Sequence, residues 1–133
     1  MKRFTYAFVS AFILAGFMSC WIFGDRIDCG NGYAYGTNGS TSSWLTKEKY
    51  ISEKDTTVIL GITSHLRGFD FNDEFIVASQ VRTDSLNRDY NAFWIIEKQT
   101  DVVHGPMSKD SFELLRKELD VPAELKVKSP YEW

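Results

Sequence analysis

The side chains best suited to chemistry in this sequence are two cysteines and two histidines. Cys20 and Cys29 are thiols that can be acylated, oxidised or used as nucleophiles, and His65 and His104 can move protons or hold a metal. No CxxC, HExxH or GxSxG motif frames any of them. We therefore expect a non-enzymatic protein with no catalytic residue, no metal site and no cofactor.

Cys20 follows a segment with the features of an export signal. Two basic residues open the chain, residues 4–18 are uncharged and mostly apolar, and Ser19 is a small residue directly before the cysteine. This arrangement resembles the lipobox of bacterial lipoproteins, in which lipid is attached to the cysteine. We therefore predict a lipoprotein-type signal peptide over residues 1–19. Acyl chains such as palmitate on Cys20 would then hold the protein at a membrane.

Two other interpretations of the N-terminus stay open. The uncharged run 4–23 is 20 residues long, which is enough for an uncleaved anchor that spans a bilayer. Cleavage near Ser19 without lipidation would give a secreted protein, and a Cys20–Cys29 disulfide could then form in an oxidising compartment. With Cys20 lipidated, Cys29 is left as a single, partly buried thiol. All three interpretations place the body outside the cytoplasm, in the bacterial cell envelope.

Length and charge predict a single acidic domain. A chain of 133 residues is one domain by ordinary priors, and we expect a tether over residues 20–31 and a globular body over 32–133. The net charge is −3, and removal of residues 1–19 also removes two of the basic residues. An acidic body without basic runs argues against nucleic-acid binding, which depends on neutralising phosphates.

Several β-branched and aromatic runs predict strands joined by short links. The expected strands lie near residues 33–35, 43–45, 56–63, 75–81, 92–96 and 102–104. The charged segment 47–55 is interpreted as a connection, within which Tyr50-Ile51 could pair with a neighbouring strand. Gly105-Pro106 is expected to end the sheet because proline lacks a backbone N–H. The links are too short for helical crossovers, so the strands are expected to be antiparallel.

One amphipathic helix is predicted after the last strand. Ser108 is a suitable N-cap, and the apolar residues Phe112, Leu115 and Leu119 form one stripe, which Leu114 is expected to widen. The sequence therefore predicts an α+β domain. Its antiparallel sheet would have about five or six strands, and the C-terminal helix would pack on one face.

The layout of the chain is similar to that of a family with no established activity. The segments that carry the likeness are 75–80, 93–98 and the closing unit from Gly105-Pro106 through Phe112 to Leu125. They resemble an uncharacterised domain-of-unknown-function family of small bacterial envelope lipoproteins, most closely from Phe75 onward. The resemblance implies no catalytic residues.

Function is therefore expected to reside in binding. We predict a membrane-tethered binding or interaction module with a protein partner in the envelope. The alternative is a carrier for a small ligand or peptide, with an aromatic pocket between sheet and helix lined by Phe75 and Trp94. Tyr131 and Trp133 in the tail are expected to dock on the body or to contact a partner.

Overall fold

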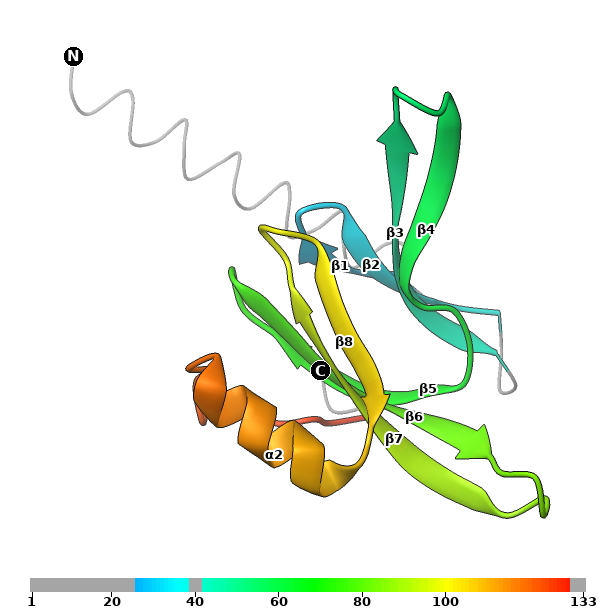
Figure 1. Cartoon of the computed structure of the whole chain (residues 1–133), viewed down its shortest axis with the longest axis vertical. Coiled ribbons are helices and arrows are strands. Elements are labelled where there is room, and N and C mark those ends of the chain that lie inside the picture. Colours follow the sequence, from blue (N-terminus) through cyan, green and yellow to red (C-terminus); the bar gives the residue numbers. More distant parts are fainter. Residues whose placement is uncertain (1–25, 39–41, 130–133) are drawn as a thin grey trace.

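The computed structural model describes residues 26–38 and 42–129, which form eight strands and one helix (Figure 1). The first four strands are β1 (Arg26–Gly30), β2 (Tyr33–Thr37), β3 (Ser43–Ile51) and β4 (Thr56–Ile62). The next four are β5 (Leu66–Phe71), β6 (Phe75–Thr83), β7 (Asp89–Glu97) and β8 (Val102–Met107), followed by the helix α2 (Lys109–Glu118). They make two four-stranded antiparallel sheets, ordered β1-β2-β3-β4 and β5-β6-β7-β8.

The predicted class is confirmed in outline, because the strands are antiparallel and one C-terminal helix packs on a sheet. The prediction of a single sheet with five or six strands is wrong. Only three residues join β4 to β5, a length typical of a hairpin, yet the chain passes there into the second sheet. His65 adopts a left-handed φ of 55° in this link. The Ser43 hydroxyl donates a hydrogen bond to the Leu66 carbonyl at 2.7 Å, which fixes the start of β5 beside the first sheet.

Two segments expected to lie outside the sheet are strands. β1 lies within residues 20–31, where a tether is expected. It forms part of the sheet because its inward residues Ile27 and Cys29 pack in the core, while Arg26 stays exposed. The second half of β3 lies within residues 47–55, the expected connection. Its residues from Glu48 to Tyr50 are exposed, so this half of the strand lacks the apolar alternation by which a buried strand is recognised in sequence.

The sheet does not end at Gly105-Pro106. Both residues lie within β8, joined by a cis peptide bond. The pairing of β7 with β8 shifts register between Phe93 and Ile95, which marks a bulge. β8 is an edge strand, and a proline on an edge or at a bulge removes no essential ladder hydrogen bond.

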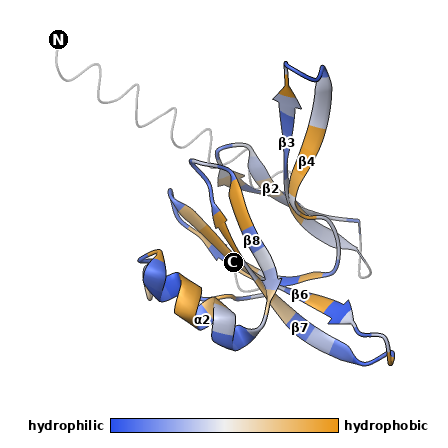
Figure 2. Cartoon of the chain, viewed as in Figure 1, coloured by the Kyte–Doolittle hydropathy of each residue, from blue (hydrophilic) through white to orange (hydrophobic). Residues whose placement is uncertain are grey.

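Opposite faces of the second sheet belong to two different cores. Ile76, Ala78 and Ile96 pack against the first sheet, together with Tyr33 and other buried residues of that sheet. The alternate residues Phe75, Val77 and Ile95 pack against α2 and the segment that follows it. Because side chains alternate along a strand, the second sheet is the middle of three layers. Because both faces of this sheet are covered, β6 and β7 carry continuous apolar runs, residues 75–78 and 92–96. Figure 2 shows hydrophobic stretches on this sheet and on α2.

The helix has the predicted cap and face. The Ser108 hydroxyl accepts a hydrogen bond from the Ser111 backbone N–H, and Leu119 forms the C-cap. Phe112 is buried and its ring lies 5.2 Å from that of Phe93 on β7. Leu114 is 65% exposed, so the expectation that it widens the apolar stripe is wrong. Its position lies too far around the helix from Phe112 to reach the sheet.

Candidate functional site

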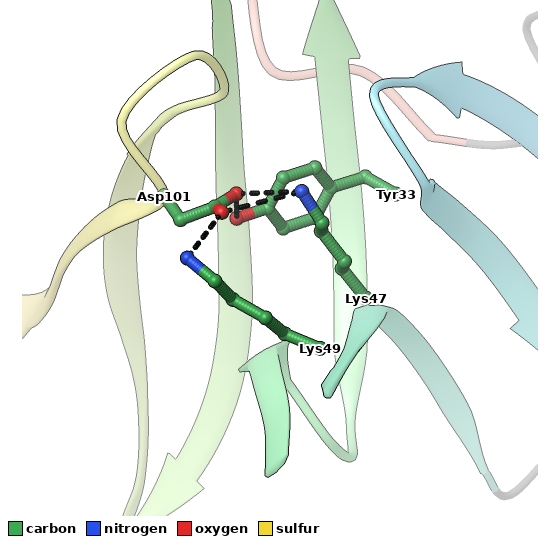
Figure 3. Close-up of polar contacts among 4 residues, drawn as sticks. All are labelled: Tyr33, Lys47, Lys49 and Asp101. Carbon is green, nitrogen blue, oxygen red and sulfur yellow. Dashed lines mark hydrogen bonds and ion pairs between the residues drawn. The ribbon is translucent and has the colours of Figure 1, made fainter. Parts of the chain in front are cut away.

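The densest group of charged and polar side chains lies where the two sheets meet (Figure 3). We call it the inter-sheet cluster, and it consists of Tyr33, Lys47, Lys49 and Asp101. Tyr33 begins β2 in the first sheet, and the two lysines lie two positions apart on β3, which places them on one face of the strand. Asp101 lies in the turn between β7 and β8 of the second sheet, with a left-handed φ of 59°.

Three donors converge on the Asp101 carboxylate. The Tyr33 hydroxyl donates to Oδ1 at 3.0 Å, and Lys47 Nζ lies 2.9 Å from Oδ1 and 3.2 Å from Oδ2. Lys49 Nζ donates to Oδ2 at 3.0 Å. Lys47 Nζ also lies 5.4 Å from the centre of the Tyr33 ring, within range of a cation–π contact. The cluster therefore links segments that are more than 50 positions apart in the sequence.

The electrostatics of the cluster fix its protonation states. Burial acts to raise the pKa of Asp101, but hydrogen bonds from Lys47, Lys49 and Tyr33 outweigh it and hold that pKa below its usual value. Burial and the hydrogen bond to Asp101 raise the pKa of Tyr33 well above its usual value. At neutral pH Asp101 is therefore an anion whose acceptors are occupied, and Tyr33 is a neutral donor. These contacts join the first sheet to the second.

A second buried polar contact involves Lys98, which is only 3% exposed. Its Nζ donates to the Asn72 carbonyl at 2.5 Å and lies 5.6 Å from the centre of the Phe71 ring. A Cβ placed on Gly30 of β1 would lie 2.8 Å from this Nζ, so the glycine makes room for the ammonium group. Burial lowers the pKa of Lys98, and nearby carboxylates oppose that effect.

The described histidines and cysteine, His65, His104 and Cys29, form no common metal-ligating group. His104 Nε2 lies 2.7 Å from Glu97 Oε2, a carboxylate–imidazole pair on β7 and β8 in which each side chain is over a quarter exposed. Cys29 is a free, fully buried thiol between the sheets, and burial raises its pKa to about 12. A thiol with that pKa stays protonated and is not a nucleophile. Among the described residues no three histidine, cysteine or acidic side chains are grouped as metal ligands.

The two aromatic residues predicted to line one pocket lie on opposite faces of the second sheet. Phe75 is in the core beneath α2, and Trp94 packs on the side of the first sheet. The Trp94 indole N–H donates to Gln80 Oε1 at 3.1 Å, and its ring covers Gly105. They cannot line the same pocket. Cys20, Tyr131 and Trp133, the other predicted site residues, lie outside the described residues.

Two hollows on the described surface are open and lined largely by charged and polar residues. The larger, about 600 Å³, lies at the C-terminal end of α2 and is lined mostly by charged residues, among them Glu113, Arg116 and Lys126. The other, about 270 Å³, lies between β5 and the tail and is lined by Arg67 and Lys128 together with Phe93 and small polar residues. Neither has the closed apolar lining typical of a small-ligand site.

An exposed apolar side chain of the first sheet lies on its β4 edge, which we define as Thr56–Ile62. The β3–β4 hairpin projects from the body (Figure 1), and Figure 2 shows a hydrophobic band along β4. The strand has no charged residue and pairs with β3 through seven consecutive positions without a register shift. Ile59 is 59% exposed. Among the described residues β4 pairs with β3 alone, so its other side is an open row of backbone donors and acceptors.

The other three sheet edges each carry a feature that discourages strand addition. The tail covers β5, since Phe69 and Lys128 exchange two backbone hydrogen bonds. β8 contains Pro106 and a register shift, and β1 has a register shift and an exposed Arg26. Such features keep edges from pairing with other chains. β4 lacks all of them.

A comparison with known families decides how this chain is classified. The family model described as "Protein of unknown function (DUF3997)" matches residues 31–131. The chain belongs to the DUF3997 family. Its membership confirms the resemblance to an uncharacterised domain family, and the matched range spans β2 through α2 and most of the tail. No curated protein and no solved structure matches the chain.

The DUF3997 range includes every residue of the inter-sheet cluster, which sequence reasoning missed. One weak signal was present, since Lys47 and Lys49 are two apart and would share a face if the segment were a strand. Their acceptor, Asp101, could not be found from sequence because it lies in a turn of the other sheet. No helix among the described residues is long and apolar enough to span a membrane.

Proposed function

We propose that this protein is a membrane-tethered lipoprotein of the bacterial envelope whose body acts as a non-enzymatic binding module. The signal-like segment 1–19 and Cys20 after Ser19 support the tether. β1 begins at Arg26, six positions after Cys20. Six residues of fully extended chain reach about 20 Å at most, so a lipid on Cys20 would keep the body close to the membrane surface.

The observation that carries the binding role is the β4 edge. Soluble proteins protect exposed strands with charges, prolines, bulges or covering segments, and β4 has none of these among the described residues. An uncharged edge strand that keeps its register is a surface that binds a further strand through backbone hydrogen bonds. The inter-sheet cluster supports this role indirectly. Lys47 and Lys49 on β3 bind Asp101 of the second sheet and so hold in place the hairpin to which β4 belongs.

Lipidation is tested by feeding cells an alkyne-tagged palmitate and comparing the wild-type chain with Cys20→Ala. We expect label on the wild type and none on Cys20→Ala. The matched control is Cys29→Ala, which also removes one thiol but leaves the proposed attachment site intact, so it should stay labelled. An unlabelled wild type, or label that persists in Cys20→Ala, would contradict the lipoprotein assignment.

A further inference from the structure

The β4 edge is self-complementary when two copies of it are placed antiparallel. Ile59 is the central residue of Thr56–Ile62, so a twofold axis beside it pairs Ile59 with Ile59 of the second copy. Val58 then faces Leu60, and Thr57 faces Gly61. The exposed Ile59 side chain would thereby be covered by its own copy, across a cross-strand pair of the kind that stabilises sheets.

We propose that β4 pairs with β4 of a second copy of this chain, so that the two first sheets join into one continuous antiparallel sheet. This inference rests on the binding role proposed above and names its partner. The shape of the molecule permits it, because the β3–β4 hairpin projects from the body and leaves the outer side of β4 open among the described residues (Figure 1). An isologous twofold pair is also the commonest form of protein self-association.

Charge favours a second copy over a charged partner. β4 has no ionisable side chain, so the paired strands bring no like charges into direct opposition. The nearest acidic group on the same face is Glu48, the β3 neighbour of Ile59. In the pair, three strand spacings separate it from Glu48 of the other copy, about 14 Å. That distance exceeds the screening length of about 8 Å at physiological salt, so their repulsion is weak.

The size of the contact indicates that pairing depends on the membrane tether. Seven residues from each copy are about a third of the 20–30 per partner found in stable interfaces, so the dimer should be weak when the chain is free in solution. Anchoring both copies in one membrane raises their effective concentration without adding any contact. The proposed pairing therefore belongs to the tethered protein and should be tested there.

The test adds one cysteine at a time to the full-length chain, which keeps Cys20 and Cys29, and treats it in its membrane with a short bismaleimide reagent. Ile59→Cys places the two thiols opposite each other across the twofold axis. Thr57→Cys is the register control, because residues 57 of the two copies lie four positions apart along the strands, about 14 Å. Leu114→Cys is the exposure control, since Leu114 on α2 is as exposed as Ile59. The unmodified chain reports any dimer formed through Cys20, and Cys29 is buried.

The expected result is a crosslinked dimer several-fold more abundant for Ile59→Cys than for both controls and the unmodified chain. Equal dimer from Ile59→Cys and Leu114→Cys would reflect random collision and would overturn the proposal. More dimer from Thr57→Cys, or none from Ile59→Cys in a folded protein, would also overturn it. The palmitate experiment has a separate readout. Lipid label without an Ile59 dimer would support the lipid tether and overturn the β4 pairing. A dimer without lipid label would support the pairing and overturn the lipid tether.

Discussion

Tyr33 and Asp101 lie 68 positions apart in the sequence, and the Tyr33 hydroxyl donates a 3.0 Å hydrogen bond to Asp101 Oδ1. The contact joins the start of β2 in the first sheet to the β7–β8 turn of the second. With Lys47 and Lys49 on the same carboxylate, it is a polar counterpart to the apolar core between the sheets. Asp101 therefore adds a polar contact to the apolar core that holds the two sheets together.

Replacing that carboxylate should destabilise the protein at neutral pH. Asp101→Asn keeps the side-chain shape and a residue type that tolerates the left-handed φ, but it removes the charge that both lysines contact. We expect a loss of about 1–3 kcal/mol in the free energy of unfolding. Urea unfolding at about pH 7 measures it. The exposed turn variant Glu53→Gln is the control and should change stability by less than about 0.5 kcal/mol.

The stability loss caused by Asp101→Asn should depend on pH. The pKa of Asp101 is depressed in the folded state, so its stabilising contribution is present above its unfolded pKa of about 4 and is lost as the pH falls through the folded pKa. The stability difference between wild type and Asp101→Asn should therefore shrink as the pH is lowered below about 4. A difference that stays constant through this range would show that the charge of Asp101 is not what stabilises the cluster.

The aliphatic part of the Lys98 side chain should contribute more to the free energy of unfolding than its charge does. Burial lowers its pKa, so the ammonium group is less favourable in the folded state than in the unfolded state, and its removal relieves that cost. We expect Lys98→Met to change the free energy of unfolding by no more than about 1 kcal/mol, because a single hydrogen bond to Asn72 is lost. Lys98→Ala should cost about 2–4 kcal/mol, since it also empties buried volume.

Chemical denaturation of the two Lys98 variants decides between these contributions. Equal losses for Lys98→Met and Lys98→Ala would mean that the hydrogen bond to the Asn72 carbonyl, and not the packing of the stem, carries the stability. The pH dependence gives a second check. A lysine whose folded pKa is depressed makes the protein more stable as the pH rises toward its unfolded pKa of about 10.4, and Lys98→Met should lack this contribution.

The Cys29 thiol should be unreactive until the protein unfolds. It is fully buried, and its pKa is raised to about 12, so at about pH 8 almost none of it is thiolate. In the Cys20→Ala chain, where Cys29 is the remaining cysteine, we expect slow alkylation by iodoacetamide in buffer and complete alkylation in urea. Mass spectrometry follows the reaction. Rapid alkylation under native conditions would contradict the buried position of β1 against the second sheet.

Two alanine substitutions on α2, Phe112→Ala and Leu114→Ala, should differ sharply in their effect on the free energy of unfolding. Phe112 is buried against Phe93, and Phe112→Ala should cost about 3–5 kcal/mol. Leu114 lies outside the buried stripe of the helix and is 65% exposed, so Leu114→Ala should cost less than about 0.5 kcal/mol. Thermal or urea unfolding measures both. Similar losses at the two positions would show that α2 packs on the sheet through a different face.

Local patterns in the sequence identified most elements but not their arrangement. The β-branched run in β4, the apolar runs of β6 and β7, and the Ser108-capped helix were all recognised, because each depends on residues close together in the chain. β8 was only partly recognised. Proline usually ends a strand, but Pro106 lies on an edge where its missing N–H has little cost.

What the sequence by itself determined is most of the elements, the antiparallel direction of the strands and the chemical character of the chain: acidic, with an export-like N-terminus and no catalytic motif. β1 and β5 became evident only in the structure. The tertiary structure decided that the strands divide into two sheets at the link containing His65, that Phe75 and Trp94 face different cores, and that Asp101 meets Lys47 and Lys49. It also decided that β4 is an open edge. The physical reason is that strand pairing and side-chain convergence are contacts between distant segments. Local periodicity records which face of a strand is apolar, but not which layer covers it.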